Sequence, residues 1–307
     1  MLLVLGSINI DLVTSAGEIP KAGETVIGTS FNQYPGGKGA NQAVCAARLK
    51  TPVRFLGKVG KDPHGDFMLG KMSESGVDVS CIERSDEPTG LAAISVGSDG
   101  QNSIIVVSGA NFTVDSAYID RNIGSIKNCD IILAQHETPV QVTEYAFKTA
   151  KSFNKTTILN PAPASTLSES MIGLTDILVP NEHELSRITG LDCSTSDDIA
   201  KAGKVLLERG VKTIIVTMGR EGVMLVRKDG TRIFPAFRVN AVDTTAAGDS
   251  FIGAFASSYI KDRDTEKAIF YGQTAASYSV QHKGAQSSMP DYAQFEEYRR
   301  KIAESRE

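Results

Sequence analysis

The sequence lacks long apolar runs and an excess of charge of one sign. None of its apolar stretches approaches the ~20 residues that a membrane-spanning helix needs, so we expect no membrane partner. Its 32 basic and 36 acidic residues give a formal net charge of -4. This near balance provides no positive field that could hold a polyanion. Nucleic acid is therefore not an expected partner either.

Cysteine and histidine are scarce, with four of each among 307 residues. The cysteines show no C-x-x-C spacing, and a chain of this size does not need disulfides. The histidines show no H-E-x-x-H pattern, which disfavours a transition-metal enzyme. The apolar start from Leu2 to Leu5 is too short for a signal peptide and lacks a basic segment. We therefore expect reduced thiols in a cytoplasmic protein.

The sequence does contain short apolar runs separated by helix-like stretches such as 139–152 and 196–209. Such alternation implies right-handed crossovers and a parallel sheet that is covered on both faces. We predict an α/β fold with a doubly wound, mostly parallel sheet. The runs that predict buried strands are 130–134, 156–160, 176–180 and 213–217.

Two segments, about 11–35 and about 88–108, do not follow this alternation. In the second segment two apolar stretches flank Ser98-Asp99-Gly100, and an Asp-Gly turn is a strong hairpin signal. We predict that the two segments form a small antiparallel β-sheet that projects as a lid from a single domain of residues 1–307. An edge hairpin of the main sheet is the alternative.

The strongest chemical motif runs from Val242 to Ala254. Apolar residues after Gly248 follow a 3.6-residue period, so a helix begins at about Gly248, with a first turn that reads Ala-Ala-Gly-Asp. Small residues let a ligand approach the free N–H groups of a helix N-terminus, which favours an anion such as a phosphate. Asp249 could accept a proton from an attacking hydroxyl there. Asp249 could instead only complement the helix dipole, but the number of small residues favours the catalytic interpretation.

Two further polar motifs lie near the N-terminus. The glycine-dense turn from Pro35 to Ala43 opens a helix and could bring a small polar ligand to Lys38 and Asn41. Its spacing is not that of a P-loop, and a plain helix entry is the alternative. Asn9 and Asp11 follow the first strand, where they could bind sugar hydroxyls or form an Asx turn.

Asn181 and Glu184 also follow a predicted strand. Asn181 can cap a helix that ends near Gly190, and the two side chains lie on one helix side, where they could hold a hydrated Mg²⁺. The segment from Thr217 to Gly222 is a strand that breaks into a glycine turn. This turn suits a nucleotide-binding wall or a simple hairpin.

These motifs, in this order, resemble those of the ribokinase-type carbohydrate kinases. The resemblance rests on Gly-Gly-Lys-Gly-Ala-Asn near the N-terminus, Asn-Pro-Ala-Pro at 160–163, Pro-Asn-Glu-x-Glu at 180–184 and Asp-Thr-Thr-Ala-Ala-Gly-Asp at 243–249. It extends from Gly6 to about Pro290. It implies a doubly wound α/β domain with a β lid, and a homodimer that forms through the lid.

The resemblance also implies roles for individual residues. Asp249 is the general base, and the sugar contacts are Asn9, Asp11, Gly37, Lys38, Asn41 and Glu137. The residues near ATP and its Mg²⁺ are Asn181, Glu184, Thr217, Gly219, Gly222, Ala247, Gly248 and Gln273. A monovalent-cation site, typically for K⁺, draws on Asp243, Thr245, Ser279, His282, Gly284 and Ser288.

The chain departs from the usual family pattern at three positions. Ile252 replaces an asparagine one helical turn after the base, and Ser287 replaces a proline beside the cation loop. Gln273 stands where a histidine is sometimes found near the adenine.

We therefore expect phosphoryl transfer from Mg·ATP to O5 of D-ribose. Kinases of 2-deoxyribose, fructose or a nucleoside would use the same chemistry. Asn9 and Asp11 favour a polyhydroxylated ring, and the chain has no tryptophan to stack on a base. A non-catalytic sugar-binding regulator is an alternative from another class. An NAD-dependent dehydrogenase is disfavoured because no G-x-G-x-x-G follows the first strand.

Overall fold

The computed structural model describes residues 1–304. Its main sheet is parallel from β6 to β13 and ends in the antiparallel strands β14 and β15. Across the sheet the order is β15 (Gly230–Phe234), β14 (Val223–Arg227), β13 (Thr213–Thr217), β12 (Ile177–Leu178), β11 (Thr156–Leu159), β10 (Ile131–Ala134), β1 (Leu2–Leu5), β4 (Val53–Leu56) and β6 (Val77–Asp78).

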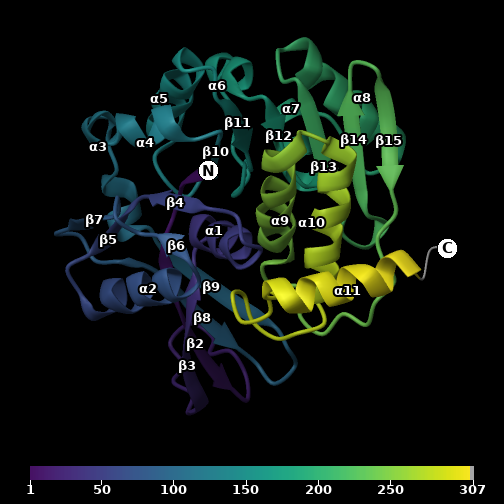
Figure 1. The fold of residues 1–307 in the computed structure, drawn as a ribbon. Helices are drawn as coiled ribbons and strands as arrows, with labels where there is room; N and C mark the ends of the chain where they lie inside the picture. Colours follow the sequence, from purple (N-terminus) through teal and green to yellow (C-terminus); the bar gives the residue numbers. More distant parts are fainter. Residues whose placement is uncertain (305–307) are drawn as a thin grey trace.

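Helices cover both faces of this sheet (Figure 1). One face packs against α1 (Lys38–Arg48), α2 (Pro63–Glu74), α9 (Ala247–Asp262), α10 (Thr265–Ser279) and α11 (Tyr292–Glu304). The other packs against α3 (Ser116–Arg121), α4 (Ile123–Asn128), α5 (Val140–Ser152), α6 (Glu169–Leu174), α7 (Glu182–Thr189) and α8 (Ser196–Glu208).

The central strand β1 shows why the sheet is buried on both faces. Leu2 and Val4 enter the core on the α1 side, whereas Leu3 and Leu5 enter the core on the α5 side. Side chains alternate between the faces of a strand, so only a continuous apolar run can satisfy both cores. The predicted α/β fold with helices on both faces is confirmed.

The second sheet contains β3 (Gly28–Gly36), β2 (Asn9–Ala16), β8 (Gly90–Val96) and β9 (Asn102–Val107), in that order. Figure 1 shows it projecting from one end of the main body. The outer pairs are antiparallel, but the central strands β2 and β8 run parallel. A third, small sheet pairs β5 (Lys58–Gly60) with β7 (Glu83–Ser85).

Two short 3₁₀ turns, η1 (Gly109–Thr113) and η2 (Gly219–Glu221), complete the elements. Across residues 1–304, no helix is long and apolar enough to cross a membrane. The four cysteines carry free thiols.

Candidate active site

The site lies where the order of the main sheet reverses. The chain leaves β1 for β4 and β6 on one side, and returns to β10 on the other side of β1. Ligands of open α/β sheets bind at the carboxyl ends of the strands beside such a switch point. The segments that follow β1 and β10 meet here, because the Ser7 hydroxyl donates a hydrogen bond of 2.6 Å to the Glu137 carboxylate.

The glycine turn before α1 packs against the end of β1. Gly37 has φ 89° and precedes the first residue of α1, a conformation that favours glycine. A Cβ atom on Gly39 would lie 2.6 Å from the Ser7 nitrogen, so a side chain there would push the two segments apart. The Lys38 N–H donates to Glu137 at 3.0 Å. The turn therefore opens a helix, as in the plain helix-entry alternative. It also places Glu137 at the N-terminus of α1.

Asn9 and Asp11 enter the site from β2. Asn9 is buried and accepts a 2.7 Å hydrogen bond from Asn111, which fixes its amide. Burial and, to a lesser extent, the negative charges of Glu137 and Asp249 raise the pKa of Asp11 to about 7. These effects place Asp11, Glu137 and Asp249 within one electrostatic field.

Lys38 is the cation of this field. Burial alone would lower the pKa of its ammonium group, but the carboxylates of Asp249, Glu137 and Glu184 outweigh burial and raise it. The ammonium group therefore remains charged at neutral pH. It offers a positive charge to an anionic ligand at the point where the carboxylates converge.

Asp249 lies in the first turn of α9 and is 7% exposed. The residue before the helix, Ala246, has φ 56°, and no side chain caps the helix. N–H groups of the first turn have no acceptor within the helix. The Ala247 N–H donates to the Thr244 carbonyl at 3.2 Å, which leaves the N–H groups of Gly248 and Asp249 available to a ligand. Gly248 is exposed, and a Cβ atom there would meet no protein atom within 4 Å. A side chain at this position would therefore enter open space at the start of α9.

The Asp249 carboxylate is held by two neighbouring amides of α1. Asn41 donates to Oδ2 at 3.0 Å and Gln42 donates to Oδ1 at 2.9 Å. Burial raises the pKa of Asp249, while Lys38, Asn41 and Gln42 lower it to a lesser extent. The result is a buried carboxylate with a pKa above its usual value, which suits a general base.

Asn181 and Glu184 form a complete capping box at the start of α7. The Asn181 side chain accepts from the Glu184 N–H at 2.8 Å, and Glu184 Oε2 accepts from the Asn181 N–H at 2.9 Å. Burial raises the pKa of Glu184, although Asn181, Lys38 and His183 oppose this effect. Capping therefore accounts for one oxygen of Glu184, and its Oε1 has no role in the cap.

The predicted nucleotide contacts fall at neighbouring strand ends. Asn181 forms an isolated β-bridge with Thr217, and the turn from Gly219 to Gly222 connects β13 with β14. Gln273 is buried, and its amide donates to the carbonyls of Phe234 and Pro235. Its donor group is thus engaged with the protein itself.

Ile252 is 3% exposed and belongs to the core on the α1 face. The isoleucine at this position, where the family usually has asparagine, therefore contributes to the packing of the core.

The residues predicted for a monovalent cation lie on two segments that meet. Asp243 accepts the N–H of Gly284 at 2.8 Å and that of Thr245 at 2.9 Å. The hydroxyls of Ser279 and Ser288 are 2.6 Å apart. The His282 ring is exposed, stacks on Tyr278 and bonds to its carbonyl. The contribution of residue 282 to a cation site would therefore come from its backbone and not from its ring.

Within residues 1–304, no cluster of three or more His, Cys, Asp or Glu side chains could hold a metal ion. A magnesium ion keeps several waters and binds through one or two carboxylates together with substrate phosphates. The oxygen donors of Asn181 and Glu184 fit that mode of binding.

Sequence reasoning missed a set of buried amides around the base. Gln135 directly follows a predicted strand and Asn160 is the last residue of another, so the rule that found Asn181 could have found them too. Nothing in the spacing distinguished the others, because their partners lie more than 100 residues away in the chain. The missed residues are Gln42, Asn111, Gln135, Asn160 and Gln286.

Comparisons with known proteins agree with this geometry. Residues 1–292 match the model of the pfkB family of carbohydrate kinases. The chain is 41% identical to a ribokinase of Haemophilus influenzae, covering 94% of this chain and 95% of the relative. It is 40% identical to a deoxyribokinase of Salmonella typhi, covering 96% and 97% of the two chains.

Solved structures show the same likeness. A structure of Arabidopsis thaliana ribokinase complexed with ribose and ATP superposes with a TM-score of 0.93 and 34% identity, covering 97% of this chain and 98% of that one. A ribokinase from Thermotoga maritima gives a TM-score of 0.89 and 39% identity, with 97% and 98% covered.

Proposed function

Because the chain belongs to the pfkB family of carbohydrate kinases, we propose that it transfers the γ-phosphoryl group of ATP to O5 of D-ribose. The products are ribose 5-phosphate and ADP. The observation that carries the proposal is the buried Asp249 carboxylate at the uncapped N-terminus of α9, within the field of Lys38. The ribokinase relatives, and the neighbour that was solved with ribose and ATP, support the choice of substrate.

In the proposed mechanism, Asp249 takes the proton of the O5 hydroxyl as O5 attacks the γ-phosphorus. The new O5–P bond forms while the bond from that phosphorus to the β,γ-bridging oxygen breaks, and ADP leaves with the electron pair. The N–H groups of Gly248 and Asp249 and the Lys38 ammonium stabilise the charge on the transferring group. Asn9, Asp11, Asn41 and Glu137 orient the sugar, with Gly37 allowing close approach.

Nucleotide binding is assigned to the edge formed by Asn181, Thr217, Gly219 and Gly222, with Gln273 supporting the segment after β15. Glu184 and Asn181 would hold Mg²⁺ through water. When bound, the ion supplies positive charge to the phosphates. Asp243, Thr245, Ser279, His282, Gly284 and Ser288 form the proposed K⁺ site, whose oxygen donors suit a hard cation.

Phosphorylation of 2-deoxyribose is the second candidate, because a deoxyribokinase is as similar to this chain as several ribokinases are. The two sugars differ only in the 2-hydroxyl group. A site that hydrogen-bonds this hydroxyl would discriminate strongly against the sugar that lacks it.

The first test is ADP formation with D-ribose, 2-deoxyribose, fructose and adenosine, each with Mg²⁺ and with or without K⁺. We expect ribose to give the highest kcat/KM. A preference for 2-deoxyribose would transfer the assignment to that sugar, and ADP formation with none of these acceptors would contradict the proposal.

The second test replaces the base. Asp249→Asn removes the proton acceptor, and a general base contributes about 10²- to 10⁴-fold to a rate. We expect kcat to fall by that factor, measured by the same ADP assay. Unchanged turnover by Asp249→Asn would remove the catalytic role from this residue.

The sheet formed by β2, β3, β8 and β9 is proposed to act as a lid and as the contact of a homodimer. Its outer strand β9 exposes consecutive apolar side chains, with Ile105 68% and Val106 55% exposed, and Phe31 on β3 is 58% exposed. An exposed apolar edge strand is an association surface unless something covers it.

A further inference from the structure

Both oxygens of the Asp249 carboxylate are engaged by amides, and those amides are held by others in turn. Gln42 Oε1 accepts from Gln135 at 2.6 Å, and Asn41 Oδ1 accepts from Gln286 at 3.1 Å. The result is a buried chain of side-chain amides that runs from Gln286 through Asn41 and Asp249 to Gln42. We refer to these residues, with Gln135 and Asn160, as the amide chain.

The orientation of each amide in the chain follows from its chemistry. An ionised carboxylate only accepts hydrogen bonds, so Asn41 and Gln42 must turn their NH₂ groups toward Asp249. Their carbonyl oxygens must then accept, and Gln286 and Gln135 supply the donors. Every dipole on either side therefore points its positive end at the carboxylate.

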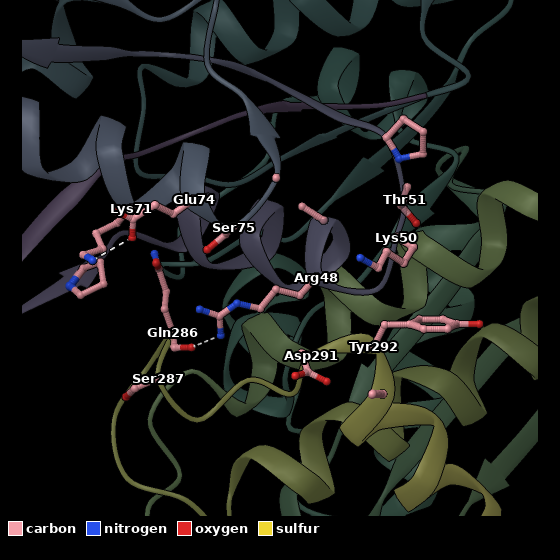
Figure 2. A pocket seen from close by; sticks show the side chains of 15 residues that line it. Arg48, Lys50, Thr51, Lys71, Glu74, Ser75, Gln286, Ser287, Asp291 and Tyr292 are labelled. Carbon is pink, nitrogen blue, oxygen red and sulfur yellow. Dashed lines mark hydrogen bonds and ion pairs between the residues drawn. The ribbon is translucent and has the colours of Figure 1, made fainter.

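Both ends of the amide chain are anchored to the main fold. Gln42 also donates to Asn160 at 3.1 Å, and Asn160 donates to the Val179 carbonyl at 3.0 Å beyond the end of β12. At the other end Arg48 donates to the backbone carbonyls of Gln286 and Met289. Figure 2 shows the Arg48 guanidinium reaching Gln286 in the cleft beside α1.

We propose that Gln42 and Gln286 are positioning residues of the phosphoryl transfer, which fix the Asp249 carboxylate directly and through Asn41. This inference rests on the proposed function, because it concerns the proton acceptor of that reaction. Neither residue has to touch the sugar or the nucleotide. Their effect is to fix the direction of the carboxylate and to favour its ionised form.

The second effect opposes the burial of the base. Burial raises the pKa of Asp249, and hydrogen bonds from Asn41 and Gln42 lower it. Removal of a donor must therefore raise this pKa further. Other ionisable groups act on Asp249 as well, and the substitutions below leave all of them in place: Lys38 and Cys45 on α1, Asp11 on β2, Glu137 after β10 and Glu184 on α7.

The first experiment measures kcat, KM and the pH dependence of kcat for Gln42→Met, Gln42→Glu and Gln286→Met. A misdirected catalytic group costs up to about 100-fold, so we expect kcat to fall about 10- to 100-fold for Gln42→Met, with KM for the sugar and ATP nearly unchanged. The acid limb of the profile moves to higher pH. Gln42→Glu moves it further, because a second carboxylate beside Asp249 disfavours its ionisation.

The matched control is Asn122→Leu, which removes a partly buried amide that donates to the Tyr118 carbonyl on the opposite face of the sheet. We expect it to leave kcat and the acid limb unchanged. If Gln42→Met and Gln286→Met keep the wild-type acid limb, or if KM rises instead of kcat falling, the inference is wrong. The proposed function would still stand on the turnover of the wild-type enzyme.

A second measurement does not depend on activity, and it keeps the inference testable whatever the substrate. The cost of Gln42→Met in thermal stability should be greater at pH 8 than at pH 5, because the unpaired carboxylate is penalised only when ionised. In an Asp249→Asn background this pH-dependent part should disappear. A cost that is equal at both pH values would overturn the inference, and Gln286→Met provides the same test should Gln42→Met fold poorly.

Discussion

At the scale of single residues, the site concentrates carboxylates in a place where burial penalises their charge. Asp11 is the clearest case, because burial and the neighbouring Glu137 and Asp249 raise its pKa to about 7. Functional sites often retain such costs because the same charges bind the ligand.

Asp11→Asn tests this cost. The pKa of Asp11 is about 7 in the folded chain and has an ordinary value of 3.8. The folded state therefore binds the proton more tightly, and stability falls as the pH rises from about 4 to 7. We expect the variant to be more stable than wild type at pH 8 by about 1–2 kcal/mol, after allowance for solvent screening, or roughly 2–8 °C in Tm. Thermal unfolding at pH 4 and pH 8 measures this difference.

At pH 4 the Asp11 carboxyl is protonated in the folded chain and only about half ionised in the unfolded chain. Most of the pH-dependent difference is then absent, so the two proteins should unfold at similar temperatures. Turnover of ribose by Asp11→Asn should fall because a charge-assisted hydrogen bond to the sugar is lost. A variant that is less stable than wild type at pH 8 would contradict the assigned electrostatics.

From the sequence alone, the charged residues at strand ends and helix starts could be predicted as site residues. Asp249 and Glu184 were predicted as site residues because local rules place such residues beside a ligand. Gln42 and Gln286 were not found, because an amide gains its role only from partners that folding brings close to it. Asn41 and Gln286 are 245 positions apart and meet in the folded chain.

At the scale of elements, the start of α9 joins a helix N-terminus without a side-chain cap to open space above Gly248. A methyl group there would touch no protein atom, but it would narrow the open space at the start of α9, where we propose that the phosphate binds. A substitution at Gly248 can therefore distinguish an effect on ligand binding from an effect on stability.

Gly248→Ala should lower kcat/KM about 10- to 100-fold, because the proposed phosphate position is narrowed and misaligned. Its Tm should be unchanged or slightly higher, since alanine favours a helix over glycine by roughly 0.5–1 kcal/mol. Steady-state kinetics and thermal unfolding are the measurements. Gly124→Ala in α4 is the control, because a Cβ atom there also meets no protein atom within 4 Å.

The control should reproduce the stability of Gly248→Ala without any loss of turnover. Wild-type kinetics for Gly248→Ala would show that no ligand group lies above this turn.

Element prediction succeeded where a signal is local. The runs at 130–134 and 213–217 became β10 and β13, and the Asp-Gly turn joins β8 to β9 as a hairpin. The parallel pairing of β2 with β8 could not be predicted, since about 80 residues of chain separate their partners and no turn fixes their direction. The resulting sheet is mixed where only antiparallel strands were expected.

At the scale of the whole molecule, the exposed face of β9 predicts association of two chains. Ile105→Glu should shift the protein from dimer to monomer, because a charge would be buried in an apolar contact. Light scattering after size exclusion, at micromolar protein, measures the change. Ile123→Glu is the control, because Ile123 is 44% exposed but lies on α4, outside the lid sheet.

We expect the control to remain dimeric. A wild-type protein that is monomeric throughout the micromolar range, or an Ile105→Glu protein that stays dimeric, would exclude the lid sheet as the contact.

The amide chain also has a consequence for the biosynthesis of the enzyme. Its members come from α1, from the ends of β10 and β11, from α9 and from the loop before α11. A ribosome delivers these parts in sequence, so a nascent chain has no supported base until the loop that contains Gln286 has emerged. A chain that is interrupted before this loop therefore lacks part of the support of its base, and full turnover requires synthesis to continue past Gln286.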